Sequence, residues 1–316
     1  VSIMPSVLAA KNKTCKPSSK SAILLDRAQG AYVGLAVGDA LGATVEFMMP
    51  AEIREQYGEH RTIVGGGWLK LKKGHVTDDT TMNFSLGRSI IEKASVDAVA
   101  IAESFSDWMR SKPVDIGHTV RRGIIHFRHT GIPEVPVSEH DGGNGVCMRT
   151  LPIALATLGA IPVDIQRLSR IHAHITHNNP LSDAGTESII HMIQCALQGG
   201  TLADIEKLAC SLAESYPPFH YSCRRRENPS GFIVETLQAV FQSLFNFPGF
   251  EKSMIDVVNR GGDADTTGAI LGMVAGALYG LSGIPIQWQN GLEEGVYKEC
   301  LHQAETLLEL SPYCRN

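Results

Sequence analysis

Glycine recurs every fourth residue in two segments of the chain that are otherwise apolar. The stripes are Gly30, Gly34, Gly38 and Gly42, and then Gly268, Gly272, Gly276 and Gly280. Residues four apart share one face of an α-helix, and glycine inside a helix costs roughly 1 kcal/mol relative to alanine. Such a stripe therefore indicates close approach of another backbone. If the two striped helices pack together, the loops at their ends meet in one neighbourhood.

Helical periodicity also extends through most of the remaining chain. With Ser21 as a candidate cap, apolar residues at helical spacing predict a first helix over 22–41. The other predicted helices span 80–92, 96–109, 117–128, 145–158, 163–173, 182–198, 202–215, 231–245, 250–259, 269–281 and 292–309. Val, Ile and Thr never alternate with polar residues over the length of a strand, and no βαβ rhythm or solenoid period occurs. The sequence predicts an all-α fold.

Composition favours one large domain in a reducing compartment. The chain has 316 residues, 43% of them hydrophobic, and no linker divides it. We expect a single domain over 21–316, preceded by a disordered extension over 1–20 whose apolar run is too short for a signal peptide. Seven scattered cysteines without CxxC spacing indicate neither a disulfide framework nor a zinc site, which favours the cytoplasm.

Charge and hydropathy exclude two classes of partner. The net charge of -5 removes the electrostatic motive for binding nucleic acid. The apolar segment 269–281 is too short to span a bilayer, so a buried core helix is expected there and no transmembrane segment. The basic run 224–226 is typical of a solvated loop.

Two short acidic clusters, far apart in the sequence, carry the strongest candidates for chemistry. The first is Thr77-Asp78-Asp79-Thr80, and the second is Gly262-Asp263-Ala264-Asp265-Thr266. Carboxylate and hydroxyl oxygens suit Mg²⁺, Mn²⁺ or Ca²⁺, and no Cys/His set accompanies them as Zn²⁺ would require. Each cluster also begins a predicted helix, so capping could account for one residue of each. On spacing alone, a metal site and plain capping are equally supported.

Three ordered motifs resemble those of the ADP-ribosylglycohydrolase family. They are 34–42 with Glu46-Phe47, the first acidic cluster and the second acidic cluster, in that order over most of the chain. Four further segments resemble the branch of the family that reactivates nitrogenase. These are 65–68, 113–117, Gly143-Asn144-Gly145 with Met148-Arg149, and 175–178. The resemblance implies an all-α fold with two Mn²⁺ or Mg²⁺ ions at the base of a cleft.

The resemblance also implies roles for individual residues. One ion would be held by Thr77, Asp78 and Asp79, and the other by Asp263, Asp265 and Thr266, with one carboxylate bridging. The candidate catalytic carboxylates are Glu46, Asp79 and Asp115. The candidate ADP-ribose contacts are Gly117, Asn144, Gly145, Met148, His177 and Phe232.

Several of these assignments have competing explanations or depart from the family pattern. On sequence alone, Glu46 could be a surface residue at a helix end, Gly143-Asn144-Gly145 an ordinary turn and His177 a core or capped residue. Asp115 would pair with the guanidinium of the scissile arginine, but on sequence alone it is equally suited to cap the helix that begins at Gly117. Phe232 stands where nitrogenase-type relatives carry a tyrosine that stacks on adenine. Phenylalanine keeps the stacking face and lacks the hydroxyl. Glu46 would gate the site or protonate the substrate near the ribose.

The activity implied by the resemblance is hydrolysis of the bond between ADP-ribose and an arginine of dinitrogenase reductase. Implied regulatory partners are a PII signalling protein and a membrane ammonium transporter, which would bring a cytoplasmic monomer to the membrane surface. Two alternatives stay open. One is a glycohydrolase for another ADP-ribosylated side chain, poly(ADP-ribose) or a small metabolite. The other is a silent relative like the lens crystallins of this family, against which the retained Asp78, Asp79, Asp263 and Asp265 argue.

Overall fold

A computed structural model describes residues 19–315 of the chain. The expected N-terminal extension lies outside the described residues as far as residue 18. Helix α1 begins at Ser19, so the last two residues of that expected extension belong to a helix instead.

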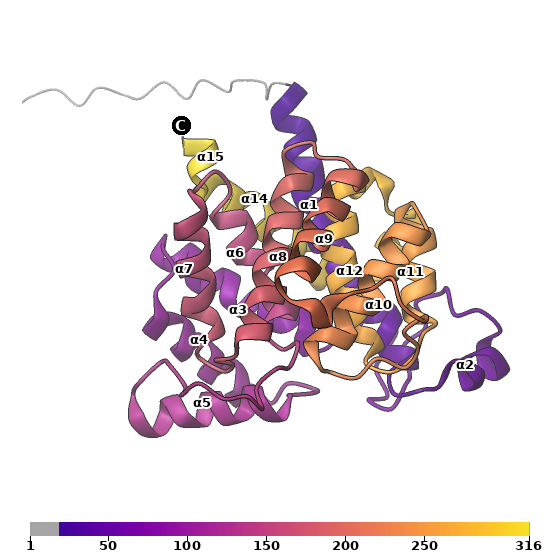
Figure 1. The fold of residues 1–316 in the computed structure, drawn as a ribbon, viewed down its shortest axis with the longest axis horizontal. Helices are drawn as coiled ribbons and strands as arrows, with labels where there is room; N and C mark the ends of the chain where they lie inside the picture. The colour runs from indigo at the N-terminus through magenta and orange to yellow at the C-terminus, as the bar shows by residue number, and fades with distance from the viewer. Residues whose placement is uncertain (1–18, 316) are drawn as a thin grey trace, which may run out of the picture.

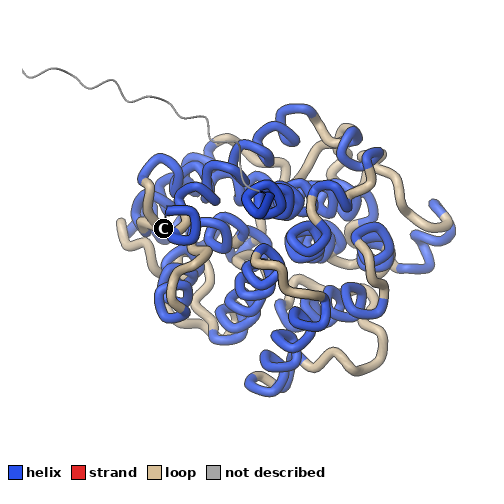
Figure 2. Tube along the Cα trace, turned by 90° about the horizontal axis from the view of Figure 1, so that it is seen from above, coloured by secondary structure: helices blue, strands red, loops and turns tan. Residues whose placement is uncertain are grey.

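Helices account for all the regular structure in residues 19–315, and the all-α prediction is confirmed (Figure 2). The helices are α1 (Ser19–Val45), α2 (Pro50–Tyr57), α3 (Asp78–Lys93), α4 (Ala98–Arg110), α5 (His118–Thr130), α6 (Leu151–Ala156), α7 (Pro162–Ala173), α8 (Pro180–Leu197), α9 (Leu202–Ser215), α10 (Ile233–Asn246), α11 (Phe250–Val258), α12 (Ala264–Tyr279), α13 (Ile286–Gly291), α14 (Glu294–Leu310) and α15 (Pro312–Arg315). Three 3₁₀ turns are η1 (Cys147–Arg149), η2 (Pro217–Phe219) and η3 (Leu281–Gly283). Strand pairing is limited to isolated bridges between Gly66 and Leu71 and between Gly143 and Phe232.

The two glycine-striped helices, α1 and α12, pack against each other through the middle of the molecule (Figure 1). A Cβ built on Gly34 would overlap the carbonyl oxygen of Gly272, and one built on Gly272 would overlap the carbonyl oxygen of Gly34. The same reciprocal overlap joins Gly38 to Gly268. Only glycine lets the two backbones approach this closely, because any side chain would have to occupy the partner's main chain. The packing reason predicted for the stripes is confirmed.

The two helices run antiparallel, and this direction places the acidic clusters together. Gly30 lies opposite Gly276, and Gly42 lies opposite Ala264, the first residue of α12. The carboxyl end of α1 therefore meets the amino end of α12. Direct contact between these two helix ends therefore brings the loop after α1 next to the second acidic cluster, although the two are more than two hundred residues apart in the sequence.

One predicted helix is broken in the structure. The segment predicted as a single helix over 145–158 forms the turn η1 and the short helix α6. Asn83 of α3 interrupts it, since Asn83 donates to the carbonyl of Met148 (2.7 Å) and accepts from the amide of Leu151 (3.2 Å). These bonds replace helical partners, and Pro152 lacks the N–H that a continuous helix would need. The sequence prediction was wrong here because a distant side chain takes the backbone partners.

The sequence analysis also missed α2, α13 and α15, which are short. A helix of eight residues or fewer, such as α2, presents too few turns to show a period. No single helix within residues 19–315 is long and apolar enough to cross a bilayer, and α1 with α2 meets that criterion only as a pair bent by 90°.

Replacing a stripe glycine should destabilise the protein strongly. Gly34→Ala forces a methyl group into the backbone of α12, and overpacking of this kind costs about 1–3 kcal/mol and occasionally more. That exceeds the gain of roughly 1 kcal/mol that alanine brings to a helix interior. Urea unfolding should show the loss. Gly295→Ala, in the exposed first turn of α14, is the matched control and should change stability little. Equal stability of the two variants would contradict the backbone contact.

Candidate metal centre and active-site cleft

Asp39, a fully buried carboxylate of α1, anchors the amino end of α3. It accepts hydrogen bonds from the backbone amides and hydroxyls of both Thr77 and Thr80, at 2.5–3.1 Å. Burial raises the pKa of Asp39 to about 6, although these four groups oppose the shift. The start of α3 is thus fixed by a side chain from the striped helix rather than by its own sequence alone.

Because Asp39 and Thr77 accept the amides at the start of α3, the side chains of Asp78 and Asp79 are not needed to cap this helix. Thr77 is the N-cap residue of α3, and its hydroxyl accepts from the amide of Asp79 at 3.4 Å. Together with Asp39, Thr77 meets the needs of the helix end. Oδ1 of Asp79 is buried and has no hydrogen-bond partner among the described residues. Capping therefore does not explain the two carboxylates of the first cluster.

The second cluster starts α12 in a similar way. Asp263 occupies the N-cap position, but its side chain makes no capping hydrogen bond. Instead, Oδ2 of Asp263 accepts from Nδ2 of Asn144 at 2.6 Å, and the same nitrogen donates to Oγ1 of Thr236 at 2.9 Å. Asp265 lies one residue into the helix and accepts the amide of Thr266 at 2.9 Å. Helix capping therefore does not explain why Asp263 is present at this position.

The two clusters meet in space and form two groups of potential ligands. In the first group, carboxylate oxygens of Asp78, Asp79 and Asp265 all lie within 4.8 Å of one another. The second group, with the same spacing, is Glu46, Asp263 and Asp265. Asp265 belongs to both, so it is the carboxylate placed to bridge two ions. Glu46 joins the ligand candidates, a position that the sequence analysis did not give it.

Crowding of carboxylates makes their charged forms unfavourable. Burial, with the nearby charge of Asp115, raises the pKa of Asp78 to about 8, and burial with the charge of Asp263 raises the pKa of Glu46 to about 8. The pKa values of Asp79 and Asp265 are raised well above their usual range, first by burial and then by neighbouring carboxylates. Cations would remove this penalty.

These residues fit a centre of hard divalent cations. The donors are carboxylate oxygens. The hydroxyl of Thr77 lies 3.2 Å from Oδ2 of Asp79 and 3.3 Å from Oδ2 of Asp265, and the side chain of Thr266 hydrogen-bonds with Asp79 and Asp263. The unpartnered Oδ1 of Asp79 supplies a buried acceptor that nothing else in the described chain uses. A buried carboxylate oxygen without a partner is costly. A metal ion would satisfy it.

A short loop after α1 brings Glu46 to the site and ties it to the second cluster. The amide of Phe47 donates to the carbonyl of Gly262 (2.7 Å), and the amide of Gly262 donates to the carbonyl of Met48 (3.1 Å). Phe47 has a φ of 63°, a strained value for a phenylalanine. The indole N–H of Trp68 donates to Oε2 of Glu46 at 2.7 Å. Glu46 is therefore held in place from two directions.

A cleft of about 300 Å³ opens over the carboxylates. Every residue predicted for the site lines it except Thr77 and Phe232. Thr77 is fully buried beneath the cleft, where its hydroxyl donates to Asp39 at 2.8 Å. Phe47, His118, Thr119 and Val120 also line it and were not predicted. The volume suits part of a dinucleotide-sized ligand with the remainder at the rim.

Asp115 and Gly117 lie in the loop that forms one wall of the cleft. Gly117 is the N-cap residue of α5, and no side chain caps that helix. Asp115 therefore does not perform the capping role that was equally plausible on sequence. Its negative charge instead contributes to the raised pKa values of Glu46 and Asp78.

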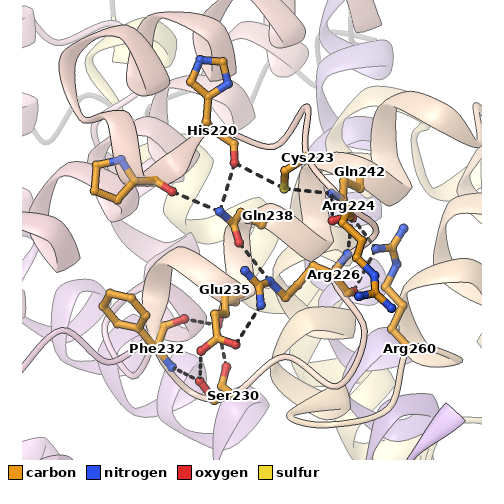
Figure 3. Close-up of polar contacts among 12 residues, drawn as sticks. His220, Cys223, Arg224, Arg226, Ser230, Phe232, Glu235, Gln238, Gln242 and Arg260 are labelled. Carbon is orange, nitrogen blue, oxygen red and sulfur yellow. Dashed lines mark hydrogen bonds and ion pairs between the residues drawn. The ribbon is translucent and has the colours of Figure 1, made fainter.

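Phe232 lies at the rim of the cleft, with its side chain 41% exposed. The adjacent Gly231 lines the cleft, and a Cβ on Gly142 would lie 3.1 Å from the Phe232 ring. The loop before α10 is held by Ser230, which donates to Glu235 (2.6 Å) and accepts from the amide of Phe232 (3.3 Å). Arg226 approaches Glu235 from the opposite side (Figure 3). An exposed, fixed ring is available for stacking.

The segment 143–148 forms another wall, but part of its hydrogen-bonding capacity is already used. Nδ2 of Asn144 serves Asp263 and Thr236, and the Asn144 amide donates to the carbonyl of Gly231 (2.9 Å). Asn144 thus orients a candidate metal ligand, while the predicted direct contact to ADP-ribose stays a prediction. Met148 and Gly145 also line the cleft.

Sequence reasoning assigned no role to Asp39 or Thr236, and Trp68 entered it only as part of the family-like segment 65–68. Asp39 is the one acidic residue within the striped segment 30–42, and a charge in an apolar, buried helix requires partners. That signal could have identified it. Trp68 and Thr236 act through contacts across the fold, which no local pattern reveals.

An all-α scaffold that gathers buried carboxylates from three elements at the base of a cleft defines a class of metal-assisted hydrolase sites. The chain belongs to the ADP-ribosylglycohydrolase family, whose model matches residues 20–315. It is 47% identical over 286 residues to the ADP-ribosyl-[dinitrogen reductase] glycohydrolase of Rhodospirillum rubrum, covering 90% of this chain and 97% of that protein. It is 30% identical to the ADP-ribosylarginine hydrolase Tri1 of Pseudomonas putida (strain GB-1), over 84% of this chain and 73% of that one.

A solved structure agrees with these relationships. The chain superimposes on a component of an ADP-ribosylglycohydrolase-related protein complex with a TM-score of 0.82 and 31% identity, covering 92% of this chain and 99% of the other. The family assignment made from the motifs is confirmed, and so is the fold that it implied.

Stability of the metal-free protein should fall as the pH rises from about 5 to about 8. Glu46 and Asp78 keep their protons up to about pH 8 in the folded protein, whereas unfolded carboxyl groups release theirs near pH 4. The unfolded state binds fewer protons throughout this window, so raising the pH favours unfolding. Thermal melts of chelator-treated protein measure the effect. Asp78→Asn should flatten the dependence, and an equally steep slope in that variant would contradict it.

Removing the shared carboxylate should affect metal binding more than removing an unshared one. Asp265→Asn takes a ligand from both groups and should abolish Mn²⁺ binding, whereas Asp78→Asn affects one group and should leave weaker, partial binding. Equilibrium dialysis gives the stoichiometry. Asp97→Asn, at the exposed N-cap of α4 where asparagine caps equally well, is the control. Full occupancy in Asp265→Asn would contradict the shared site.

Proposed function

We propose that the protein hydrolyses the N-glycosidic bond between ADP-ribose and an arginine side chain of dinitrogenase reductase, which would restore that protein's activity. The observation that carries the proposal is the 47% identity to the Rhodospirillum rubrum enzyme over nearly the whole of both chains. The cleft adds support, because Glu46, Asp115 and the two acidic clusters all line it.

The proposed cofactor is a pair of Mn²⁺ or Mg²⁺ ions. Asp78, Asp79 and Asp265 would hold one ion, and Glu46, Asp263 and Asp265 the other, with the hydroxyls of Thr77 and Thr266 close by. When bound, such ions orient sugar hydroxyls and lower the pKa of water. Asp39 and Asn144 would keep the ligands in place.

The reaction requires a carboxylate environment at the anomeric carbon of the ribose. The C–N bond breaks, a water oxygen joins the anomeric carbon, and a proton reaches the departing guanidine nitrogen, giving ADP-ribose and arginine. Positive charge develops on the ribose during cleavage, and nearby carboxylates stabilise it. Asp115 would pair with the guanidinium and align it. Glu46 lines the cleft and is the candidate residue for proton transfer to the leaving group when no ion engages its carboxylate.

The remaining predicted contacts fit the rest of ADP-ribose. Phe232 would stack on the adenine, since its ring is exposed at the rim and fixed by the loop before α10. Gly117, Gly145 and Met148 would border the ribose and diphosphate. Regulation by a PII signalling protein and an ammonium transporter extends the proposal. It rests on the resemblance to the nitrogenase branch alone.

A cleavage assay on three substrates tests the proposed function. The enzyme should release ADP-ribose from arginine-modified dinitrogenase reductase with Mn²⁺, and release should stop with chelator. Serine-linked and acetyl-linked ADP-ribose should be cleaved at least about a hundredfold more slowly, because they lack a guanidinium for Asp115 to align. Asp115→Asn should lose activity on the arginine substrate, with Asp97→Asn as the control. Faster cleavage of the serine linkage would contradict the proposed arginine specificity. Cleavage of other arginine-modified proteins, without cleavage of modified dinitrogenase reductase, would contradict the proposed protein substrate and favour a role like that of Tri1.

A further inference from the structure

Arg149 is a fully buried cation without a carboxylate partner among residues 19–315. Its Nη2 donates to the carbonyl of His172 (3.0 Å) and to Oγ1 of Thr176 (2.8 Å). Its guanidinium carbon lies 4.7 Å from the centroid of the Phe105 ring, while Nε and Nη1 have no acceptor among the described residues. A buried, partly unsatisfied charge is costly, so its retention calls for a compensating role.

Thr176 connects this cation to the cleft. Its Oγ1 lies 2.8 Å from Nδ1 of His177, which lines the cleft. Arginine can only donate, so Thr176 accepts from Arg149 and has one O–H left to give. No other acceptor for that O–H occurs among the described residues, and a buried hydroxyl left unpaired costs about 1–3 kcal/mol. The hydroxyl therefore donates to Nδ1, and the ring proton of His177 is on Nε2.

His177 is also kept neutral. Burial, with the charges of Arg149 and Arg122, lowers the pKa of His177 to about 3. Its Nε2 has no hydrogen-bond partner within the described chain. The ring edge packs against the backbone of Gly143 and Gly145, since a Cβ on Gly143 would lie 3.2 Å from Nε2 and one on Gly145 would lie 2.9 Å from Cε1. With no side chain at either position, the ring keeps its place in the lining of the cleft.

We propose that Arg149 and Thr176 are positioning residues that hold His177 as the neutral Nε2–H tautomer, so that it donates a hydrogen bond to an oxygen of ADP-ribose in the cleft. The inference rests on the proposed function for the identity of the ligand. A neutral donor suits this place, because a charged imidazolium would be drawn to the carboxylates across the cleft instead. The donor's direction is fixed before the ligand arrives, which lowers the entropy cost of binding.

The tautomer can be measured in the free, full-length protein. Two-bond ¹H–¹⁵N spectra of histidine-labelled enzyme, with the His177 signal identified by its loss in His177→Gln, show which ring nitrogen carries the proton. We expect a protonated Nε2 and an unprotonated Nδ1 at neutral pH. Thr176→Ser should preserve this pattern, and Thr176→Val should produce a mixture of tautomers. A protonated Nδ1 in the wild-type protein would overturn the inference, whatever the ligand is and even if Thr176→Val does not fold.

Binding of free ADP-ribose, measured by calorimetry, tests the consequence. Thr176→Val should weaken binding roughly tenfold, the value of about one hydrogen bond, and Thr176→Ser should bind like the wild type. Thr157→Val is the matched control, because Thr157 is also a buried threonine that accepts from a side chain (Gln194) but lies away from the cleft. Equal weakening by Val and Ser, or no weakening by Val, refutes the inference. A wild-type protein that does not bind ADP-ribose refutes the proposed function, and with it the ligand named here.

Discussion

The backbone contact between α1 and α12 is the constraint on which the rest of the structure depends. Two glycine stripes let main chains touch along several turns, with Gly34 against Gly272 and Gly38 against Gly268. Contact at this distance fixes both the separation and the register of the helices, since a shift would drive side chains into backbone. The register sets Gly42 opposite Ala264. The positions of Glu46 and Asp263 therefore follow from a helix contact that begins beside the cleft and continues away from it along both helices.

Much of the fold could be predicted from the sequence, because the informative signals were local or repeated. Amphipathic helices such as α4 and α10 show their period directly, and the stripes predicted the central pair. The segment 145–158 was predicted as one helix although Pro152 is a local break signal, and the partner that fixes the break, Asn83, comes from another helix and shows in no local pattern. Candidate ligands could be proposed because carboxylates cluster in sequence. The sharing of Asp265, and the placement of Glu46 beside it, depend on three-dimensional distances that no spacing encodes.

Some polar groups of the site hold neighbouring elements in place, whereas others line the cleft and are available to a ligand. Asp39 and Asn144 spend their hydrogen bonds on Thr77, Thr80 and Asp263, which fixes the elements that carry the ligands. Within residues 19–315, Oδ1 of Asp79 has no hydrogen-bond partner. Asp39 and Asn144, which hold neighbouring elements, are thus satisfied within the protein, whereas Asp79, which lines the cleft, keeps an unused oxygen.

Two helix amino ends favour negative charge where the carboxylates gather, but their contribution is too small to offset the repulsion among the carboxylates. Helices α3 and α12 present their amino ends to the cluster, where backbone N–H groups favour negative charge by about 0.3–1 kcal/mol each. Helix α1 presents its carboxyl end at Glu46, which disfavours it. The raised pKa of Asp78 despite its place in the first turn of α3 shows that repulsion and burial exceed the helix contribution. The fold therefore assembles the carboxylates but leaves most of their neutralisation to protons or to bound cations.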